Sequence, residues 1–200
     1  MKLVCLDLEG VLVPEIWISF AEKTGIEHLR LTTRDIPDYD VLMKGRLDIL
    51  REHGLKLRDI QDVISRIDPL EGALDFLDEL RVRTQVVILS DTFSQFAGPL
   101  MKKLAWPTLF CNELEVAADG SISGYRLRQK DGKRHAVEHF TAMGFTVFAA
   151  GDSYNDLGMI THAATGAFFR APHTIVEAHP EIPAVEDYDG FLTLVEKFLA

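Results

Sequence analysis

The chain has 200 residues, which is enough for one full domain with a sizeable insertion and a large apolar core. Its 21 Lys and Arg residues against 31 Asp and Glu residues give a formal net charge of −10, which argues against nucleic acid or an anionic membrane as a partner. No stretch approaches the roughly 18 consecutive apolar residues of a membrane span. Cys5 and Cys111 form no CxxC pair, and Asp7 and Glu9 interrupt the first apolar run, so we expect no signal peptide and a cytoplasmic protein with reduced thiols.

Short aliphatic runs alternate with helical patterns along most of the chain. The runs lack polar alternation, as parallel strands covered on both faces do, and they predict strands at 2–8, 85–90, 145–150 and 166–169. Asp68 and Pro69 are typical of a helix start and precede a leucine stripe over 70–80. Thr92 and Gln95 have the spacing of a capping box, which predicts a helix over 93–104. This alternation indicates a doubly wound, mostly parallel α/β sheet.

Two segments break the alternation. Residues 14–66 carry helical patterns near 15–24, 39–53 and 57–66, with the loop TTRDIPD after the first, and no convincing strand. That length exceeds one crossover between parallel strands, so we expect an inserted helical subdomain. Residues 112–128 read NELEVAADGSISGYRLR, where an Asp-Gly turn between two alternating arms predicts a β-hairpin. We therefore predict a core of residues 1–13 plus 68–200 and a helical insertion at 14–67.

Polar side chains follow the predicted strands at the points where they end. Asp7 and Glu9 come at the end of the first strand, and Ser90 and Asp91 at the end of the second. The strand at 145–150 runs into GDSYND, which contains Asp152, Asn155 and Asp156. Lys130 and Lys133 flank the start of a further helical pattern. Because ligands of open α/β sheets bind at the carboxyl ends of the strands, the fold should bring these residues together.

Several carboxylates in one cleft cannot all stay ionised without a cation, and oxygen ligands without His or Cys predict Mg²⁺. Beside a bound phosphate, Asp7 is a candidate nucleophile and Glu9 a candidate proton shuttle. Ser90 and one lysine would bind the phosphate. Taken singly, each of these residues also has an ordinary explanation as a helix cap, a turn or a surface charge. Their joint occurrence in the order Asp, Ser, Lys, Asp favours catalysis.

Arg46 occupies the apolar stripe of the helix predicted at 39–53, because its neighbours three and four positions away are Leu, Met, Ile and Leu. A guanidinium there is costly unless it is paired. We expect one of three arrangements: an internal salt bridge, a side chain that extends along the apolar surface to place its charge in water, or a clamp on a substrate carboxylate. Glu15, at the start of the first inserted helix, is explained either by the helix dipole or by a bound substrate ammonium.

The motifs together resemble those of the haloacid dehalogenase-like superfamily. DLEGV resembles its first motif, ILSDT the second, KRHAV the third and GDSYNDLGM the fourth. The helical insertion after the first motif is similar to the C1-type cap of phosphoserine phosphatases. DLEGVLVPEIW, TTRDIPDYDVLMK, PLEGA and QVVILSDTF further resemble the group of bifunctional phosphoserine phosphatases and homoserine phosphotransferases.

The resemblance implies a role for each matching residue. Asp7 would be the nucleophile, Glu9 the acid and base, and Ser90 and Lys133 the phosphate ligands, with Lys130 as the alternative lysine. The metal would be held by Asp7, by Asp152, by the backbone carbonyl of Glu9 and, directly or indirectly, by Asp156. The substrate-binding residues would be Glu15, Arg46, Ser90, Asp91, Lys133 and Asn155.

The implied function is Mg²⁺-dependent hydrolysis of L-phosphoserine through an aspartyl-phosphate, with phosphoryl transfer to homoserine as a second activity. The alternatives are a phosphatase of the same superfamily for another small phosphate ester and a receiver-like phospho-acceptor domain. A receiver carries its acceptor aspartate on a middle strand and lacks a helical insertion, which argues against it. Glu9 stands where the phosphatase pattern has Asp, and we expect its longer reach to slow water attack and so favour transfer. The sequence does not indicate an oligomeric state.

Overall fold

The computed structural model of the chain describes residues 1–33, 35–36 and 38–200. The aliphatic runs form strands β1 (Lys2–Leu6), β2 (Gln85–Phe93), β5 (Thr146–Gly151) and β6 (Thr165–Phe169) of one sheet. The sheet has the order β4-β3-β2-β1-β5-β6-β7, which includes β3 (Thr108–Val116), β4 (Ile122–Arg126) and β7 (Ala184–Val185). All pairings are parallel except that of β3 with β4. From β1 the chain builds β2 and β3 on one side and β5 and β6 on the other, which makes β1 the switch point of a doubly wound sheet.

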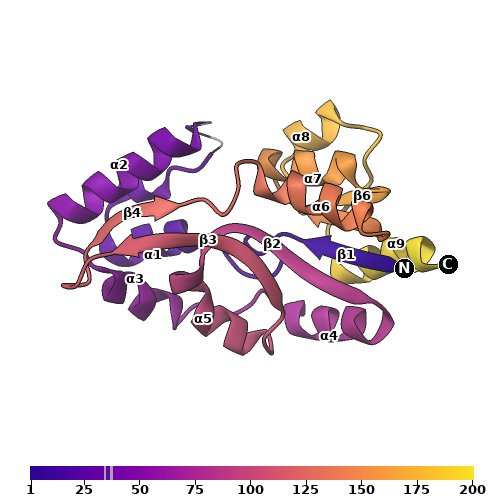
Figure 1. The fold of residues 1–200 in the computed structure, drawn as a ribbon, viewed down its shortest axis with the longest axis horizontal. Coiled ribbons are helices and arrows are strands. Elements are labelled where there is room, and N and C mark those ends of the chain that lie inside the picture. The colour runs from indigo at the N-terminus through magenta and orange to yellow at the C-terminus, as the bar shows by residue number, and fades with distance from the viewer. Residues whose placement is uncertain (34, 37) are drawn as a thin grey trace.

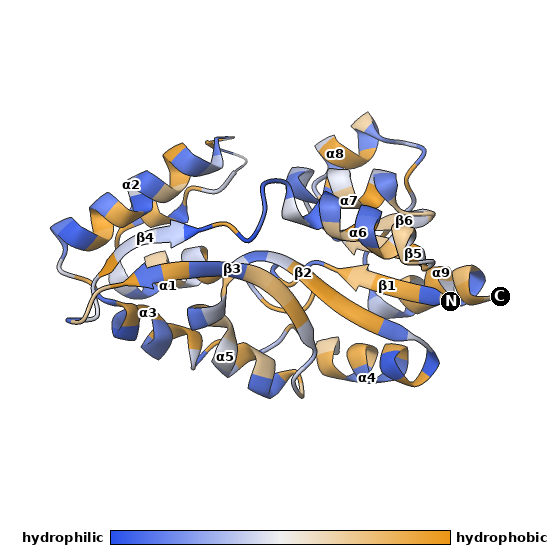
Figure 2. Cartoon of the chain, viewed as in Figure 1, coloured by the Kyte–Doolittle hydropathy of each residue, from blue (hydrophilic) through white to orange (hydrophobic). Residues whose placement is uncertain are grey.

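Helices cover both faces of this sheet (Figure 1). One face carries α4 (Ala73–Arg83), α5 (Ser94–Lys103) and α9 (Tyr188–Leu199), and the other α6 (Gly132–Ala142), α7 (Leu157–His162) and α8 (His173–Ala178). Successive β1 residues point to opposite faces, so that Val4 packs in one apolar cluster and Cys5 in the other. Figure 2 shows the resulting run of hydrophobic residues along β1 and β2. A short 3₁₀ turn, η2 (Tyr154–Asp156), lies between β5 and α7.

The segment between β1 and α4 is helical, as the sequence predicts. It contains α1 (Ile16–Thr24), the 3₁₀ turn η1 (Glu27–Arg30), α2 (Tyr39–Glu52) and α3 (Leu57–Ile64), which form a small cap. The predicted loop TTRDIPD includes residues 34 and 37, which lie outside the described residues. The cap packs on the core, where the Trp17 ring of α1 meets the Phe96 ring of α5 edge to face at 5.8 Å. The boundaries at 13/14 and 67/68 remain a prediction.

The predicted hairpin is also present, as β3 and β4, and its tip docks on the cap. Gly120 takes up a φ of 85° at the turn, and its carbonyl accepts the Leu57 N–H at 3.0 Å. Lys56 Nζ donates to the Asp119 carbonyl at 2.9 Å. Further along, the Tyr125 hydroxyl donates to the Asp40 carboxylate of α2. The hairpin thus ties the sheet to the cap.

Several element boundaries differ from the sequence predictions, including those of β1, α4 and β2. β1 ends at Leu6 rather than residue 8. Helix α4 begins at Ala73 and not at Asp68-Pro69, because the Leu70 N–H bonds to the Leu12 carbonyl at 2.9 Å and residues 71 and 72 form a turn before the helix. β2 continues to Phe93, past the residue 90 at which the sequence predicted its end.

The predicted capping box of Thr92 and Gln95 is wrong. Helix α5 starts directly after the strand, with Phe93 at the cap position and no side-chain cap. The Gln95 amide instead pairs with the backbone of Leu114 in β3, accepting its N–H at 2.9 Å and donating to its carbonyl at 3.0 Å. The Gln95 side chain therefore binds the backbone of a distant strand and is not available for the capping box. Among the described residues, no helix is long and apolar enough to cross a membrane.

We predict that Gln95→Ala lowers the free energy of unfolding by about 1–3 kcal/mol, because it leaves both backbone groups of the buried Leu114 without partners. Urea denaturation measures the change. The control is Gln129→Ala, which alters an exposed glutamine and should stay within about 0.5 kcal/mol of the parent chain. Equal effects of the two substitutions would contradict the assignment.

Candidate active site

The residues singled out in the sequence meet in a cleft at the carboxyl ends of β1, β2 and β5. The core contributes one wall and the cap the other. The lining residues are Asp7, Glu9, Glu15, Trp17, Thr32, Thr33, Tyr39, Leu42, Arg46, Ser90, Asp91, Thr92, Phe93, Lys133, Asp152, Ser153 and Asn155. This is the switch-point crevice where α/β sheets of this kind bind ligands.

Asp7 and Lys133 form the centre of the site. Asp7 directly follows β1 and is 5% exposed, and Lys133 in the first turn of α6 is 4% exposed. Asp7 Oδ1 accepts the Leu8 N–H at 2.7 Å and lies 2.9 Å from Lys133 Nζ, which lies 2.7 Å from Asp156 Oδ1. Burial acts to lower the pKa of Lys133, but the carboxylates of Asp156 and Asp7 outweigh it and hold that pKa well above its usual value. The lysine is therefore a fixed cation.

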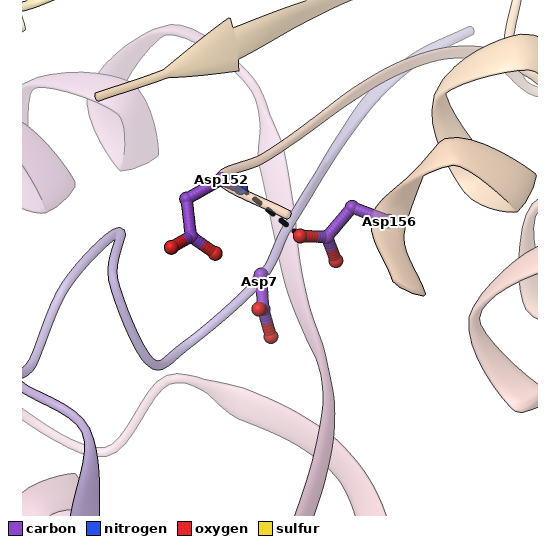
Figure 3. Close-up of side chains that lie close together, drawn as sticks. All are labelled: Asp7, Asp152 and Asp156. Atoms are coloured by element: carbon purple, nitrogen blue, oxygen red, sulfur yellow. Dashed lines mark hydrogen bonds between the residues drawn. The ribbon is translucent and has the colours of Figure 1, made fainter. Parts of the chain in front are cut away.

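Asp7, Asp152 and Asp156 crowd around one point (Figure 3). Each offers one oxygen, and these oxygens lie within 4.8 Å of one another. Asp156 is fully buried, and its Oδ2 accepts the N–H groups of Asp152 at 3.0 Å and Ser153 at 3.1 Å, which shapes the loop. Burial, together with the charge of Asp156, raises the pKa of Asp7 well above its usual value, although Lys133 acts against this. Three buried carboxylates beside one lysine form a donor set for a hard divalent cation.

Two glycines keep space for these acids. Gly10 has a φ of 78°, and a Cβ on it would lie 2.3 Å from Asp152 Oδ2. A Cβ on Gly151 would lie 2.1 Å from Asp156 Cγ. Any side chain at either position would displace a carboxylate, so backbone and acids approach each other closely here.

The Ser90–Thr92 segment lies where the register between β2 and β3 shifts, between Leu89 and Phe93. Ser90 Oγ accepts the Thr92 N–H at 3.2 Å, which leaves the serine hydroxyl hydrogen to donate into the cleft. Asp91 Oδ2 accepts from Asn155 Nδ2 at 3.0 Å, so these two side chains hold each other. The buried Thr92 Oγ1 has no hydrogen-bond partner among the described residues.

Glu9 reaches from the core to the cap. Its Oε2 accepts the backbone N–H of Ile16, the first residue of α1, at 2.9 Å. Burial raises the pKa of Glu9 to about 8, with Glu15 acting in the same direction and the Ile16 N–H and Arg46 acting against it. A carboxyl group with a pKa near neutrality can both give and take a proton at physiological pH.

Arg46 is a buried cation that faces the same cleft, 7% exposed. Its guanidinium lies over the Trp17 ring at 4.5 Å, and Nη2 donates to the Leu31 carbonyl at 2.7 Å. Burial lowers its pKa to about 10, against the opposing effect of Glu9, Tyr39 and Glu15. In the described part of the chain no carboxylate lies within 4 Å of the guanidinium, and Nε has no hydrogen-bond partner. The arrangement suits an anionic ligand.

The structure therefore brings together Asp7, Glu9, Glu15, Arg46, Ser90, Asp91, Lys133, Asp152 and Asn155, with Asp156 directly behind them. Lys130 is exposed and does not line this cleft. Glu15 is the residue before α1 rather than part of its first turn. Tyr39 was missed, although it stands on the same helical stripe as Arg46; its hydroxyl donates to the Asp91 carbonyl at 3.2 Å.

We predict that Lys133→Met lowers the free energy of unfolding of the metal-free protein by about 3–5 kcal/mol, because it leaves the buried Asp7 and Asp156 carboxylates without their cation. Chemical denaturation in EDTA measures this loss. Lys130→Met is the matched control, an exposed lysine in the segment just before α6, and should change stability by less than about 0.5 kcal/mol. Similar losses for the two variants would refute the buried-cation assignment.

Comparisons with known proteins identify the family of the chain. Residues 1–164 match the family model of haloacid dehalogenase-like hydrolases. The chain is 59% identical over 189 residues to the phosphoserine phosphatase ThrH of Pseudomonas aeruginosa, covering 94% of this chain and 92% of the relative. It is also 59% identical over 189 residues to a phosphoserine phosphatase of Pseudomonas syringae pv. tomato, covering 94% of this chain and 80% of that protein.

The fold is likewise shared with solved structures. The crystal structure of a phosphoserine phosphatase in its apo form superposes with a TM-score of 0.76 at 24% identity, covering 94% of each chain. By family match and by close relatives alike, the chain belongs to the haloacid dehalogenase-like hydrolases.

Proposed function

We propose that this hydrolase is a Mg²⁺-dependent phosphatase for L-phosphoserine that also transfers the phosphoryl group to homoserine. The observation that carries the proposal is the buried guanidinium of Arg46, to which no described residue presents a carboxylate within 4 Å, in the same cleft as the Asp7–Lys133 pair. One end of the cleft then suits a phosphate and the other a carboxylate. The names of the two Pseudomonas relatives support the same substrate.

The chemistry follows from the position of Asp7. Its Oδ1 is held by Leu8 and Lys133, which leaves Oδ2 to attack the phosphorus of the bound ester. As the new P–O bond forms, the bond from phosphorus to the serine oxygen breaks, and Glu9 gives that oxygen a proton. The products are serine and an aspartyl-phosphate on Asp7. Lys133 and the Ser90 hydroxyl neutralise the charge on the phosphoryl oxygens.

Glu9, now deprotonated, serves the second half-reaction as a base. It takes a proton from water while the water oxygen attacks phosphorus, the bond to Asp7 breaks, and inorganic phosphate leaves. If the hydroxyl of homoserine takes the place of water, the product is phosphohomoserine. When a proton acceptor lies about 1 Å from its best position, the attack of water can slow by about two orders of magnitude. The longer side chain of Glu9 would therefore favour the alcohol acceptor.

The residues present fit Mg²⁺. Asp7, Asp152 and the Glu9 backbone carbonyl would hold the ion, with Asp156 as a further ligand or as support for the loop. The donors are all oxygens, and the carboxylates outnumber the buried lysine beside them. When bound, the ion supplies positive charge at the carboxylates and at one phosphoryl oxygen.

The amino-acid part of the substrate would lie against the cap. Arg46 would bind its carboxylate and Glu15 its ammonium, since the two side chains line the cap wall of the cleft. Asp91 and Asn155 would complete the pocket from the core, where they hydrogen-bond each other. We further propose residues 14–67 as the cap domain and the cytoplasm as the location, where the free thiols of Cys5 and Cys111 stay reduced.

The function is tested by phosphate release from L-phosphoserine in Mg²⁺ or in EDTA, with and without homoserine. We expect release in Mg²⁺, its loss in EDTA, and phosphohomoserine among the products when homoserine is present. Asp7→Asn should abolish turnover, because the amide is not a nucleophile. Activity confined to sugar phosphates, or substantial turnover of the Asp7→Asn variant, would refute the proposal.

Substrate recognition has its own test at Arg46. Arg46→Ala should raise KM for L-phosphoserine about tenfold to 100-fold, because charged hydrogen bonds to the carboxylate are lost. The control is a substrate, O-phosphoethanolamine, which lacks the carboxylate and should respond less than about threefold to the same substitution. An equal rise in KM for both substrates would show that Arg46 supports the cap rather than the ligand.

A further inference from the structure

We propose that the first backbone N–H of α1 positions the carboxylate of Glu9. We further propose that position 9 carries glutamate because the shorter side chain of aspartate would not reach this N–H. The backbone N–H of Ile16 holds the carboxylate in the orientation for proton transfer. The inference rests on the proposed function, in which Glu9 is the acid and base. It assigns a positioning role to a backbone group of the cap, outside the residues that contact the phosphate.

The hydrogen bond at the start of α1 is unusual because its acceptor is distant in the sequence. The first N–H groups of a helix lack partners within it, and the preceding residue normally caps one of them. Here that residue, Glu15, makes no side-chain cap. The Ile16 N–H is instead satisfied at 2.9 Å by Glu9 Oε2, from seven residues upstream. The helix is therefore capped by the proposed acid and base.

The length of the side chain decides whether this contact exists. An aspartate on the same backbone would end roughly 1.5 Å shorter, the length of one C–C bond. Added to the present 2.9 Å, that shortfall would take the N···O distance past the hydrogen-bonding limit of about 3.2 Å. Glutamate spans the gap between core and cap, and aspartate would not.

Both ends of the contact are held by other interactions, so neither can shift to compensate. On the core side, the Leu12 N–H bonds to the Leu8 carbonyl and the Gly10 N–H to the Val13 carbonyl, both at 2.8 Å, which makes the turn around Glu9 compact. On the cap side, Ile16 is 1% exposed, and its neighbour Trp17 packs on Phe96 of the core. The carboxylate is thus fixed from two directions.

The contact also divides the work between the two carboxylate oxygens. Oε2 is engaged by the Ile16 N–H, whereas no described residue donates a hydrogen bond to Oε1. The side chain lines the cleft beside Asp7, so Oε1 is the oxygen available to the leaving group and to water. Without the Ile16 N–H the carboxyl group would rotate freely, and proton transfer would lose its alignment.

Ile16→Pro removes this N–H and leaves the helix start intact. Proline is favoured at the first helical position, and Glu15 already has φ −58° and ψ 119°, the extended conformation that precedes proline. Ile16→Val is the matched control, because valine and proline both carry three side-chain carbons and valine keeps the N–H. With L-phosphoserine and Mg²⁺, we expect kcat of Ile16→Pro to fall at least about tenfold below that of Ile16→Val, with KM within about threefold.

A second substrate distinguishes a loss of Glu9 positioning from a general disruption of the active site. The nitrophenolate of p-nitrophenyl phosphate leaves without a proton, so its first-turnover burst should differ by less than about threefold between the two variants. In the Glu9→Asp background, whose side chain does not reach α1, adding Ile16→Pro should change kcat by less than about threefold. If Ile16→Pro does not fold, the α-hydroxy acid analogue of isoleucine at position 16 removes the same N–H and keeps the side chain.

Two outcomes would overturn the inference. Equal kcat values of the proline and valine variants, or equal slowing of both substrates, would reduce the Ile16 contact to a structural helix cap. A parent chain that hydrolyses no phosphoserine would instead remove the proposed function, and this inference with it. The two failures are therefore told apart by the activity of the unsubstituted chain.

Discussion

The site depends on one buried cation held between two buried acids. Lys133 Nζ lies 2.9 Å from Asp7 and 2.7 Å from Asp156, and all three side chains are almost wholly removed from water. A charge in such a place is stable only while its partners stay within hydrogen-bond distance. The end of β1, the loop after β5 and the first turn of α6 must therefore meet at one point. The parallel register of the central strands and the apolar layers on both faces of the sheet hold them there.

The core and the cap contribute different groups to the cleft. The core presents the groups that suit a phosphate, namely carboxylates, a lysine and the hydroxyl of Ser90. The cap presents Arg46 and Glu15, which suit the charges of an amino acid. Glu9 belongs to both, since its backbone lies in the core and its carboxylate ends on α1. In the proposed function, the Glu9 side chain therefore joins the groups that carry the chemistry to the groups that bind the substrate.

Much of the fold could be predicted from residue types, because apolar runs without polar alternation indicate buried parallel strands. The polar residues that follow such strands meet at one edge of the sheet. The same argument places Asp7, Ser90 and Asp152 in one cleft, where the structure has them. Ala136 and Val137 follow Lys133 by one helical turn and favour this lysine over Lys130 as the one that faces the core, and Lys133 is the buried one. The roles of these residues remain proposals.

What could not be predicted depended on contacts between distant parts of the chain. Gln95 looked like half of a capping box, but its amide pairs with a strand 19 residues away. The start of α4 was placed too early because the preceding chain bonds to Leu12, which no local pattern reveals. The contact of Glu9 with the Ile16 N–H could not be predicted, because nearly every residue type has a backbone N–H. The 3₁₀ turn at Glu27–Arg30 is too short to show a period.

The hairpin formed by β3 and β4 changes how freely the cap can move. A body joined to another by two chain crossings keeps one hinge axis, the line through those crossings. The hairpin of β3 and β4 extends to the far end of the molecule (Figure 1), and its tip adds a further attachment there, through its contacts with Leu57 and Lys56 at the start of α3. Any rotation of the cap relative to the sheet would therefore have to break the tip contacts or bend the hairpin, in addition to separating the Trp17 and Phe96 rings.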